Sequence, residues 1–115
     1  MMFRVDPAAP EPLFRQIAGQ VRGAIADGRL AAGDRLPPAR ELAAALDVNM
    51  HTVLRAYGGL RDEGLVEMRR RRGVVVQDNA AGRARLVAAT AALADEARRL
   101  GMTRAEVVAL VEEAM

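Results

Sequence analysis

Residues 37–63 have the sequence PPARELAAALDVNMHTVLRAYGGLRDE, and this stretch decides the fold. It opens with two prolines, which cannot lie inside a helix but can start one. In the ARELAAAL segment that follows, the apolar residues share one side of a helix: Ala39, Leu42, Ala43 and Leu46. A tight break at Asp47 and Val48 separates this helix from another, for which Asn49 is a typical N-cap residue. The pattern predicts two short helices joined by a turn.

A further helix is expected on the N-terminal side. Its apolar residues recur at every fourth position, with Phe14 and Ala18 beside them: Leu13, Ile17, Val21 and Ile25. Pro12 suits the first helical position, and Gly28 suits the cap at the C-terminal end. The sequence therefore predicts a helix, with one apolar face, between these two residues.

Short β-strands are expected on the C-terminal side. The helix that begins after Asn49 runs to about Glu63 and is stopped by Gly64. Beyond it, LVEMR and GVVVQ are two β-rich runs separated by arginines and Gly73, which predicts a hairpin. Arg35 and Leu36 form at most a strand stub. The predicted fold of residues 1–79 is mainly α with a small β-hairpin, in the order of a winged helix-turn-helix, although other small α+β domains share that order.

Residues 80–115 differ in character and predict a two-helix tail. Leu86, Leu93 and Leu100 lie seven residues apart, which places them on one stripe of a helix. Gly101 ends that helix, and the sequence from Thr103 to Glu106 is a capping box that starts the next. Two helices of this size cannot bury their apolar faces against each other alone. The tail therefore predicts dimerisation through Leu86, Leu93, Ala97, Leu100, Val107, Val108, Leu110 and Val111; the alternative is packing onto residues 1–79 within a monomer.

Composition excludes most catalytic chemistry. The 115 residues include no Cys, Ser, Lys or Trp and a single His, His51. Thiolate, serine and Schiff-base nucleophiles are therefore impossible, and a metal site has one imidazole at most. We accordingly expect no enzyme activity, no metal site and no cofactor. No apolar run approaches the ~18–20 residues that span a bilayer, and the N-terminal MMFRVDPAAPEP has no signal-peptide core. The expected location is the cytoplasm, without a membrane partner.

The distribution of charge is more informative than its total. All 17 basic residues are Arg, against 15 acidic ones, so the net charge is +2. The sequence pI of about 10.3 largely reflects the missing Lys, because almost nothing else titrates between neutrality and the Arg range. Arg69, Arg70, Arg71 and Arg72 form the single dense basic cluster, between the two predicted strands. Because strand residues alternate between faces, four consecutive arginines favour a nearby polyanion over a solubilising charge run.

The helix after Asn49 has the pattern of a recognition helix. Its apolar side carries Val53, Ala56, Tyr57 and Leu60. The opposite side carries His51 and Arg55, with Thr52 beside them. Asn pairs with adenine, and Arg pairs with guanine or a phosphate. A solvated polar face remains the alternative at this point.

Four blocks of sequence together resemble the DNA-binding domain of the GntR family of bacterial transcription regulators. They are PLFRQI at 12–17, GRLAAGDRLPPARELAAALDVN at 28–49, TVLRAY at 52–57 and LRDEGLV at 60–66. The C-terminal LADEARRLGMTRAEVVALVEEAM is similar to the two-helix tail of the short YtrA subfamily. This resemblance implies a winged helix-turn-helix that binds DNA. Regulators of the YtrA type are often encoded beside transporter genes, so the resemblance also implies a regulon of that kind.

The resemblance implies contacts at particular residues. Arg40 matches the arginine that contacts phosphate or base in the family, and residues 49–52 occupy the start of the recognition helix. Two departures stand out: Leu54 replaces an arginine of some relatives, and Arg71 replaces a usual glycine of the wing. The expected DNA contacts, from the pattern and the resemblance together, are Arg40, Asn49, Met50, His51, Thr52, Arg55, Arg69, Arg70, Arg71, Arg72 and Gly73.

The sequence therefore predicts a sequence-specific regulator, a repressor, that binds double-stranded DNA as a homodimer at an inverted-repeat operator. Two alternatives stay open. One is a winged-helix module that binds a protein through its wing or third helix. The other is a sensor whose small-molecule ligand lies in the dimer groove, although the short apolar tail predicts no pocket of useful size. The effector, if there is one, is unknown.

Overall fold

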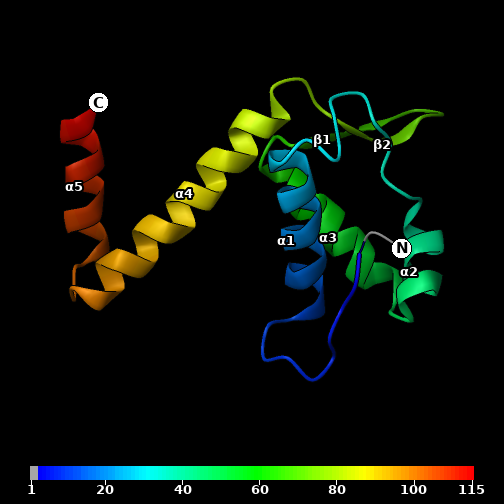
Figure 1. The fold of residues 1–115 in the computed structure, drawn as a ribbon, viewed down its shortest axis with the longest axis horizontal. Coiled ribbons are helices and arrows are strands. Elements are labelled where there is room, and N and C mark those ends of the chain that lie inside the picture. Colours follow the sequence, from blue (N-terminus) through cyan, green and yellow to red (C-terminus); the bar gives the residue numbers. More distant parts are fainter. Residues whose placement is uncertain (1–2) are drawn as a thin grey trace. The chain divides into compact units, whose positions relative to one another are not determined.

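The computed structural model describes residues 3–115 (Figure 1). This part of the chain forms five helices and a two-stranded antiparallel hairpin, which confirms the predicted fold class. The elements are α1 (Leu13–Ala26), α2 (Ala39–Leu46), α3 (Met50–Asp62), β1 (Val66–Arg69), β2 (Gly73–Val76), α4 (Ala80–Arg99) and α5 (Arg104–Ala114). The chain divides into two compact units between Arg85 and Leu86. In the described residues, no helix is long and apolar enough to span a membrane.

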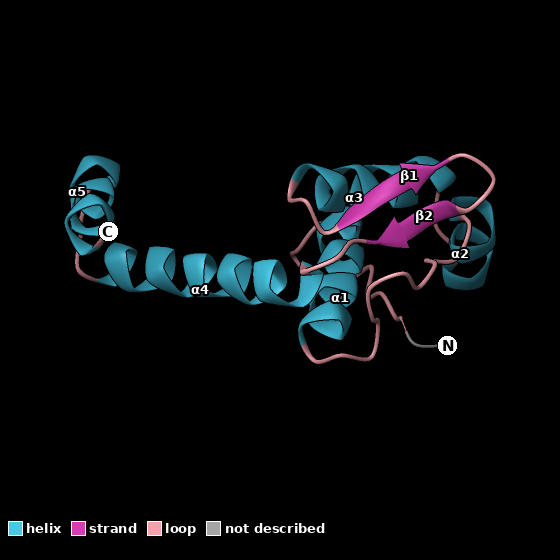
Figure 2. Ribbon diagram, turned by 90° about the horizontal axis from the view of Figure 1, so that it is seen from above, coloured by secondary structure: helices cyan, strands magenta, loops and turns pink. Residues whose placement is uncertain are grey.

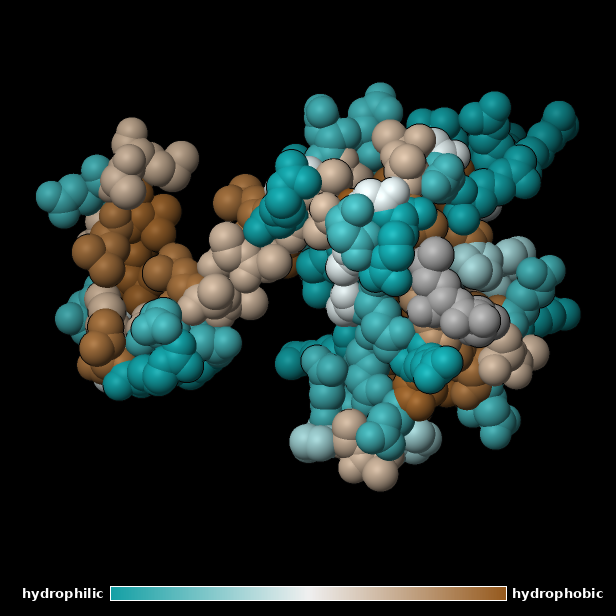
Figure 3. Space-filling view, in the orientation of Figure 1, coloured by the Kyte–Doolittle hydropathy of each residue, from teal (hydrophilic) through white to brown (hydrophobic). Residues whose placement is uncertain are grey.

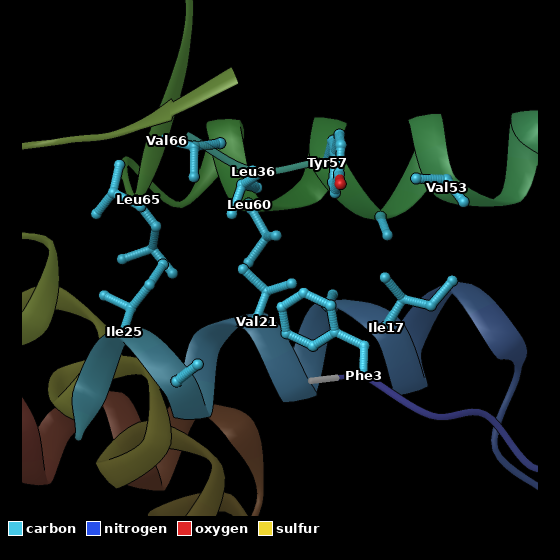
Figure 4. Packing of buried hydrophobic residues seen from close by; sticks show 14 of the residues in the cluster. Phe3, Ile17, Val21, Ile25, Leu36, Val53, Tyr57, Leu60, Leu65 and Val66 are labelled. Atoms are coloured by element: carbon cyan, nitrogen blue, oxygen red, sulfur yellow. The ribbon is translucent and has the colours of Figure 1, made fainter. Parts of the chain in front are cut away.

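The core of the first unit lies mainly between α1 and α3 (Figure 4). The helix α2 packs on α3. The predicted apolar face of α1 is buried from Ile17 to Ile25, while Leu13 is half-buried. The predicted inner side of α3 is also confirmed: Val53, Ala56, Tyr57 and Leu60 are buried. The helical periodicity of apolar residues therefore predicts the core positions of α1 and α3 correctly.

The boundary of α1 differs slightly from the prediction. Pro12 precedes the helix as its N-cap residue, because its ψ of 145° is extended rather than helical. At the other end the helix stops at Ala26, and Gly28 follows with a φ of +86°, as expected of a glycine that ends a helix.

The segment before α1 is part of the fold, which the sequence analysis did not predict. Phe3 is buried in the core, and the chain runs back along α1 in extended form. Gln16 and Gln20 each bind the backbone of this segment through both ends of their side-chain amide, Gln16 at Asp6 and Gln20 at Arg4. A glutamine every fourth residue gives α1 a polar edge that matches the backbone of an extended strand.

The helix-turn-helix has the predicted caps. Asp47 ends α2 in the left-handed region, with a φ of 56°. The Oδ1 atom of Asn49 accepts a 2.7 Å hydrogen bond from the backbone N–H of His51, which confirms the predicted N-cap of α3. After α3, Gly64 takes a φ of +79° and turns the chain into β1. The turn is therefore held by local hydrogen bonds that its sequence supplies.

The hairpin forms the wing (Figure 2). Val66 pairs with Val76, and Arg69 pairs with Gly73, so that residues 70–72 make the tip. The predicted strand stub is a single bridge from Arg35 to Val75. Leu36 donates a 2.8 Å backbone hydrogen bond to Val74, which attaches the segment before α2 to the wing.

The first turn of α4 is packed into the first unit. Ala80 and Ala84 are buried in its core, and the Arg83 Nε donates a 3.3 Å hydrogen bond to the carbonyl oxygen of Glu63. The expected domain boundary after residue 79 lies directly before α4, whereas the first compact unit runs on to Arg85.

The second unit contains the rest of α4 and all of α5. The predicted capping box is confirmed: Thr103 Oγ1 accepts from the Glu106 backbone, and Glu106 Oε1 accepts from the Thr103 backbone. Ala97 is buried at the side of α4, whereas α5 has no buried residue. Figure 3 shows the apolar side chains gathered over α5.

Candidate nucleic-acid interface

The start of α3 presents a polar surface. Asn49 and His51 are exposed, and Thr52 is half-buried. Because Asn49 Oδ1 caps the helix, a bidentate contact to adenine has to share that oxygen with the His51 N–H. Met50 differs from the other expected contacts: its side chain is half-buried and packs against the core.

Arg55 lies against α1. Its guanidinium carbon is 3.8 Å from the centroid of the Phe14 ring, a cation–π contact. Arg55, Phe14, His51 and Thr52 line one shallow hollow at this end of the helix pair, together with Leu13. The structure thus brings three expected contacts together and adds Phe14, which the sequence analysis assigned only to the face of a helix. The signal that would have found it is an aromatic residue in the first turn of α1.

The stack leaves the hydrogen-bonding edge of Arg55 free. Within residues 3–115 this guanidinium has no hydrogen bond and no ion pair, and its face lies over the Phe14 ring. A planar guanidinium held by its face keeps its N–H donors for a bidentate partner such as guanine or a phosphate.

The wing concentrates exposed positive charge. Arg69 pairs with Glu67 on the same strand, whereas Arg70, Arg71 and Arg72 form no ion pair within the described part of the chain. Arg71 has a φ of +71°, in the left-handed region, where a side chain is strained. A glycine, which the resemblance implied at this position, adopts that conformation without strain.

A second hollow separates the wing from α2 and α3. It has a volume of about 850 Å³, and the expected residues Arg69, Arg71, Arg72 and Gly73 line it. Arg40 and Arg70 are exposed but do not line it. Seven of the expected residues therefore line one of two hollows, one beside α1 and one beside the wing, whereas Arg40, Asn49, Met50 and Arg70 line neither.

No group of three or more His, Asp or Glu side chains that suits a metal ion occurs among residues 3–115. The described features are a capped recognition helix, a wing tipped with unpaired arginines and polar side chains at the exposed end of α3. They define the class of winged helix-turn-helix DNA-binding proteins.

Comparison with known proteins gives the family. Residues 13–76 match the family described as "Bacterial regulatory proteins, gntR family". The chain belongs to the GntR family. It is a transcriptional regulator with a DNA-binding domain, as the resemblance implied, and this favours DNA over the protein-interaction alternative.

Several relatives extend the similarity beyond the wing. An HTH-type transcriptional regulator of Mycobacterium tuberculosis is 39% identical over 103 residues, which cover 90% of this chain and 85% of that protein. The HTH-type transcriptional repressor YtrA of Bacillus subtilis is 38% identical over 79 residues, 69% of this chain and 61% of the repressor. A solved structure of YtrA from Sulfolobus acidocaldarius, a GntR-family transcription factor, has a TM-score of 0.64 at 39% identity and covers 82% of this chain and 99% of its own. The resemblance to the YtrA type is confirmed, and the role of these relatives is regulatory rather than enzymatic.

Proposed function

We propose that this chain is a homodimeric repressor that binds double-stranded DNA at an inverted-repeat operator and blocks the polymerase sterically. It acts in the cytoplasm, where bacterial DNA lies, and needs neither metal nor cofactor. The repressor role is supported by the name of the Bacillus subtilis relative. The observation that carries the proposal is the exposed apolar stripe of the tail.

That stripe is exposed in the part of the chain that the structure describes. Leu86 is 68% exposed and Leu100 is 74% exposed, and Leu93 lies midway between them on α4. The other large exposed residues of the expected set are on α5: Val108, Leu110 and Val111. A stripe of this kind is typical of a helix that is buried against a second copy. Ala97 and Val107 line a small hollow between α4 and α5, beside Met102, and shape the inner side of the same surface.

In the proposed complex α3 enters the major groove and the wing approaches the minor groove. Asn49, His51, Thr52 and Arg55 select the sequence, with Met50 supporting them from the core side. The positive residues Arg40, Arg69, Arg70, Arg71 and Arg72 bind phosphates, and Gly73 lets the wing tip approach the duplex. A two-fold dimer separates the two recognition helices by about 34 Å or a multiple of it, so the operator is an inverted repeat.

The test is salt-dependent binding to random duplex DNA and to the region upstream of the gene, together with sedimentation of the free protein. We expect a dimer that binds the upstream fragment tightly and loses affinity steeply as salt rises. The double variant Arg71→Ala, Arg72→Ala is expected to bind both duplexes more weakly. Its affinity is also expected to depend less steeply on salt, because fewer phosphate contacts release fewer counterions from the DNA. Weak and equal binding to both fragments would contradict an operator upstream of the chain's own gene, and an unchanged salt dependence would contradict the role of the wing.

The dimer is tested separately with Leu86→Glu and Leu100→Glu. Both side chains are exposed in the single chain, so the variants are expected to fold and to sediment as monomers. Ala88→Glu, which adds the same charge at an exposed position on the opposite side of α4 from Leu86, is the matched control and is expected to stay dimeric. A double variant that remains dimeric would contradict the proposed interface.

A further inference from the structure

We propose that Leu54 reads the C5-methyl group of a thymine in the operator, and that Met68 packs against the sugar of the same DNA strand. The inference rests on the proposed binding of an operator by α3 and the wing.

The two side chains lie on opposite walls of the hollow beside the wing. Leu54 projects from α3 and Met68 from β1, and both line this hollow. Leu54 is 38% exposed and Met68 is 55% exposed, so neither side chain is fully used by the core. Apolar parts of Pro37 and Val74 continue the floor between them.

Arginines surround this apolar floor. Arg35, Arg71 and Arg72 line the same hollow, and none of the three has an ion pair within residues 3–115. Glu41 and the paired Arg69 line it as well, so the lining still carries more positive than negative charge. Apolar groups below a rim of cations match a chain of alternating phosphates and deoxyriboses. A purely apolar partner would leave these guanidinium groups without an anion, so charge complementarity selects a DNA strand as the occupant.

The fold indicates where that strand runs. When a recognition helix lies in the major groove and a wing reaches the neighbouring minor groove, one sugar–phosphate strand crosses between them. In this chain the space between α3 and the wing is the hollow that Leu54 and Met68 line. The strand therefore passes over the apolar floor with its phosphates toward the arginines.

The chemistry of leucine then selects the base. Leu54 has no hydrogen-bonding group, so it can discriminate only by apolar contact. Thymine is the base whose major-groove edge carries a methyl group. Leu54 belongs to the helix that enters that groove, whereas Met68 belongs to the wing and reaches the strand from the other side. The methyl reading is therefore assigned to Leu54 and the sugar contact to Met68.

Replacing thymine by uracil removes the methyl group and nothing else, which gives a direct test. An operator is first selected from random duplexes with the full chain, and each of its thymines is then replaced by uracil in turn. We expect one position in each half-site at which the loss of the methyl weakens binding about fourfold, the effect of exposing one buried methyl or methylene group. The Leu54→Ala protein is expected to bind thymine and uracil equally at that position.

Two further variants distinguish recognition of the thymine methyl group by Leu54 from the sugar contact of Met68. Leu54→Met keeps an apolar side chain of similar volume and is expected to keep the preference for thymine. Met68→Ala is expected to weaken binding to all sequences alike and to leave the thymine preference unchanged. Thermal unfolding checks that each variant is folded, which the exposure of both residues favours.

The outcomes are distinguishable. An operator in which every thymine tolerates uracil, or a Leu54→Ala protein that still prefers thymine at the same position, would overturn the inference while leaving the proposed function intact. A chain that selects no sequence from the random duplexes would overturn the proposed function, and the reading of thymine with it.

Discussion

The hydroxyl of Tyr57 donates a 2.7 Å hydrogen bond to the carbonyl oxygen of Pro37, and so ties the recognition helix to the residue two positions before α2. The ring is only 1% exposed, and burial raises the pKa of the phenol far above its ordinary value. This bond fixes α3 relative to the segment that leads into α2. One part-buried polar contact therefore links α3 to the segment that leads into α2, the helix that carries Arg40.

The raised pKa of Tyr57 predicts a loss of stability in alkaline solution. The folded state favours the protonated phenol, so this contribution is complete below the ordinary pKa of about 10 and declines as the pH rises above it. The chain has one Tyr and neither Cys nor Lys, so no other side chain titrates in that range. We expect the free energy of unfolding in urea to fall above about pH 10, and the ultraviolet absorbance of tyrosinate to appear only as the protein unfolds.

The matched variant is Tyr57→Phe, which keeps the ring and removes the hydroxyl. At neutral pH it is expected to be about 1 kcal/mol less stable, the usual contribution of one hydrogen bond. Its stability is expected to depend less on pH above about pH 10 than that of the original chain. Equal alkaline losses in the two proteins would show that Tyr57 does not control this transition.

The strained wing tip gives a second prediction. Arg71 has a φ of +71°, so Arg71→Gly is expected to stabilise the fold by about 1 kcal/mol, because glycine adopts this conformation freely. The same change removes one phosphate contact and is expected to weaken DNA binding and to lower the salt slope by about one. Arg70→Gly is the control, since Arg70 lies outside the left-handed region. It is expected to weaken DNA binding without a gain in stability, and equal stabilities of the two variants would remove the argument from strain.

Much of the first unit could be predicted from the sequence because its signals are local. The apolar positions of α1 and α3 follow the period of a helix, and Asn49 and Gly64 mark the ends of α3 by their own chemistry. The hairpin follows from two short β-rich runs. These signals require no knowledge of distant contacts.

Features that depend on tertiary contacts were missed. Phe3 carries no periodic pattern, and the segment after it is hydrogen-bonded at Arg4 and Asp6 to the side chains of Gln20 and Gln16, ten or more residues away along the chain. The stack of Arg55 on Phe14 joins two helices whose packing no local pattern specifies. The resemblance marked Arg71 as a residue that replaces a wing glycine. Only the structure shows that its backbone is in the left-handed region.

The stack on Phe14 predicts a positioning role in base recognition. Arg55→Ala is expected to relax the preference at one or two base positions, because a bidentate contact to guanine is lost. Phe14→Leu removes the ring that holds the guanidinium and is expected to relax the preference at the same positions, to a smaller extent. Binding to a set of single-base operator variants measures both effects.

Two controls separate positioning from folding. Phe14→Tyr keeps an aromatic ring and is expected to restore the preference, and Phe14→Leu in the Arg55→Ala background is expected to add no further relaxation. Equal losses of affinity on every sequence for Arg55→Ala would instead make Arg55 a phosphate contact. A Phe14→Leu protein with unchanged discrimination would show that the stack does not orient the guanidinium.

Two glycines inside α3 give the last prediction. Gly58 and Gly59 have helical backbones, and an added Cβ atom would meet no atom closer than 4.0 Å. Packing therefore does not require them, and Gly58→Ala and Gly59→Ala are each expected to raise the free energy of unfolding by about 0.5–1 kcal/mol. Gly64 contrasts with both, because its φ is +79° and a Cβ there would lie 2.7 Å from the Arg83 Nε. Gly64→Ala is expected to lower stability by about 1 kcal/mol or more.

Urea denaturation of the three variants measures whether stability rises or falls as expected. DNA binding of Gly58→Ala and Gly59→Ala then shows whether either glycine matters for contact with the duplex. Gly58 lies nearer than Gly59 to the α3 face that carries His51 and Leu54. If the duplex approaches α3 closely at Gly58, the Gly58→Ala protein gains stability but loses DNA affinity, while Gly59→Ala gains stability alone. A loss of stability in either helical variant would show that the glycine is needed by the fold, in contradiction to the open space around it.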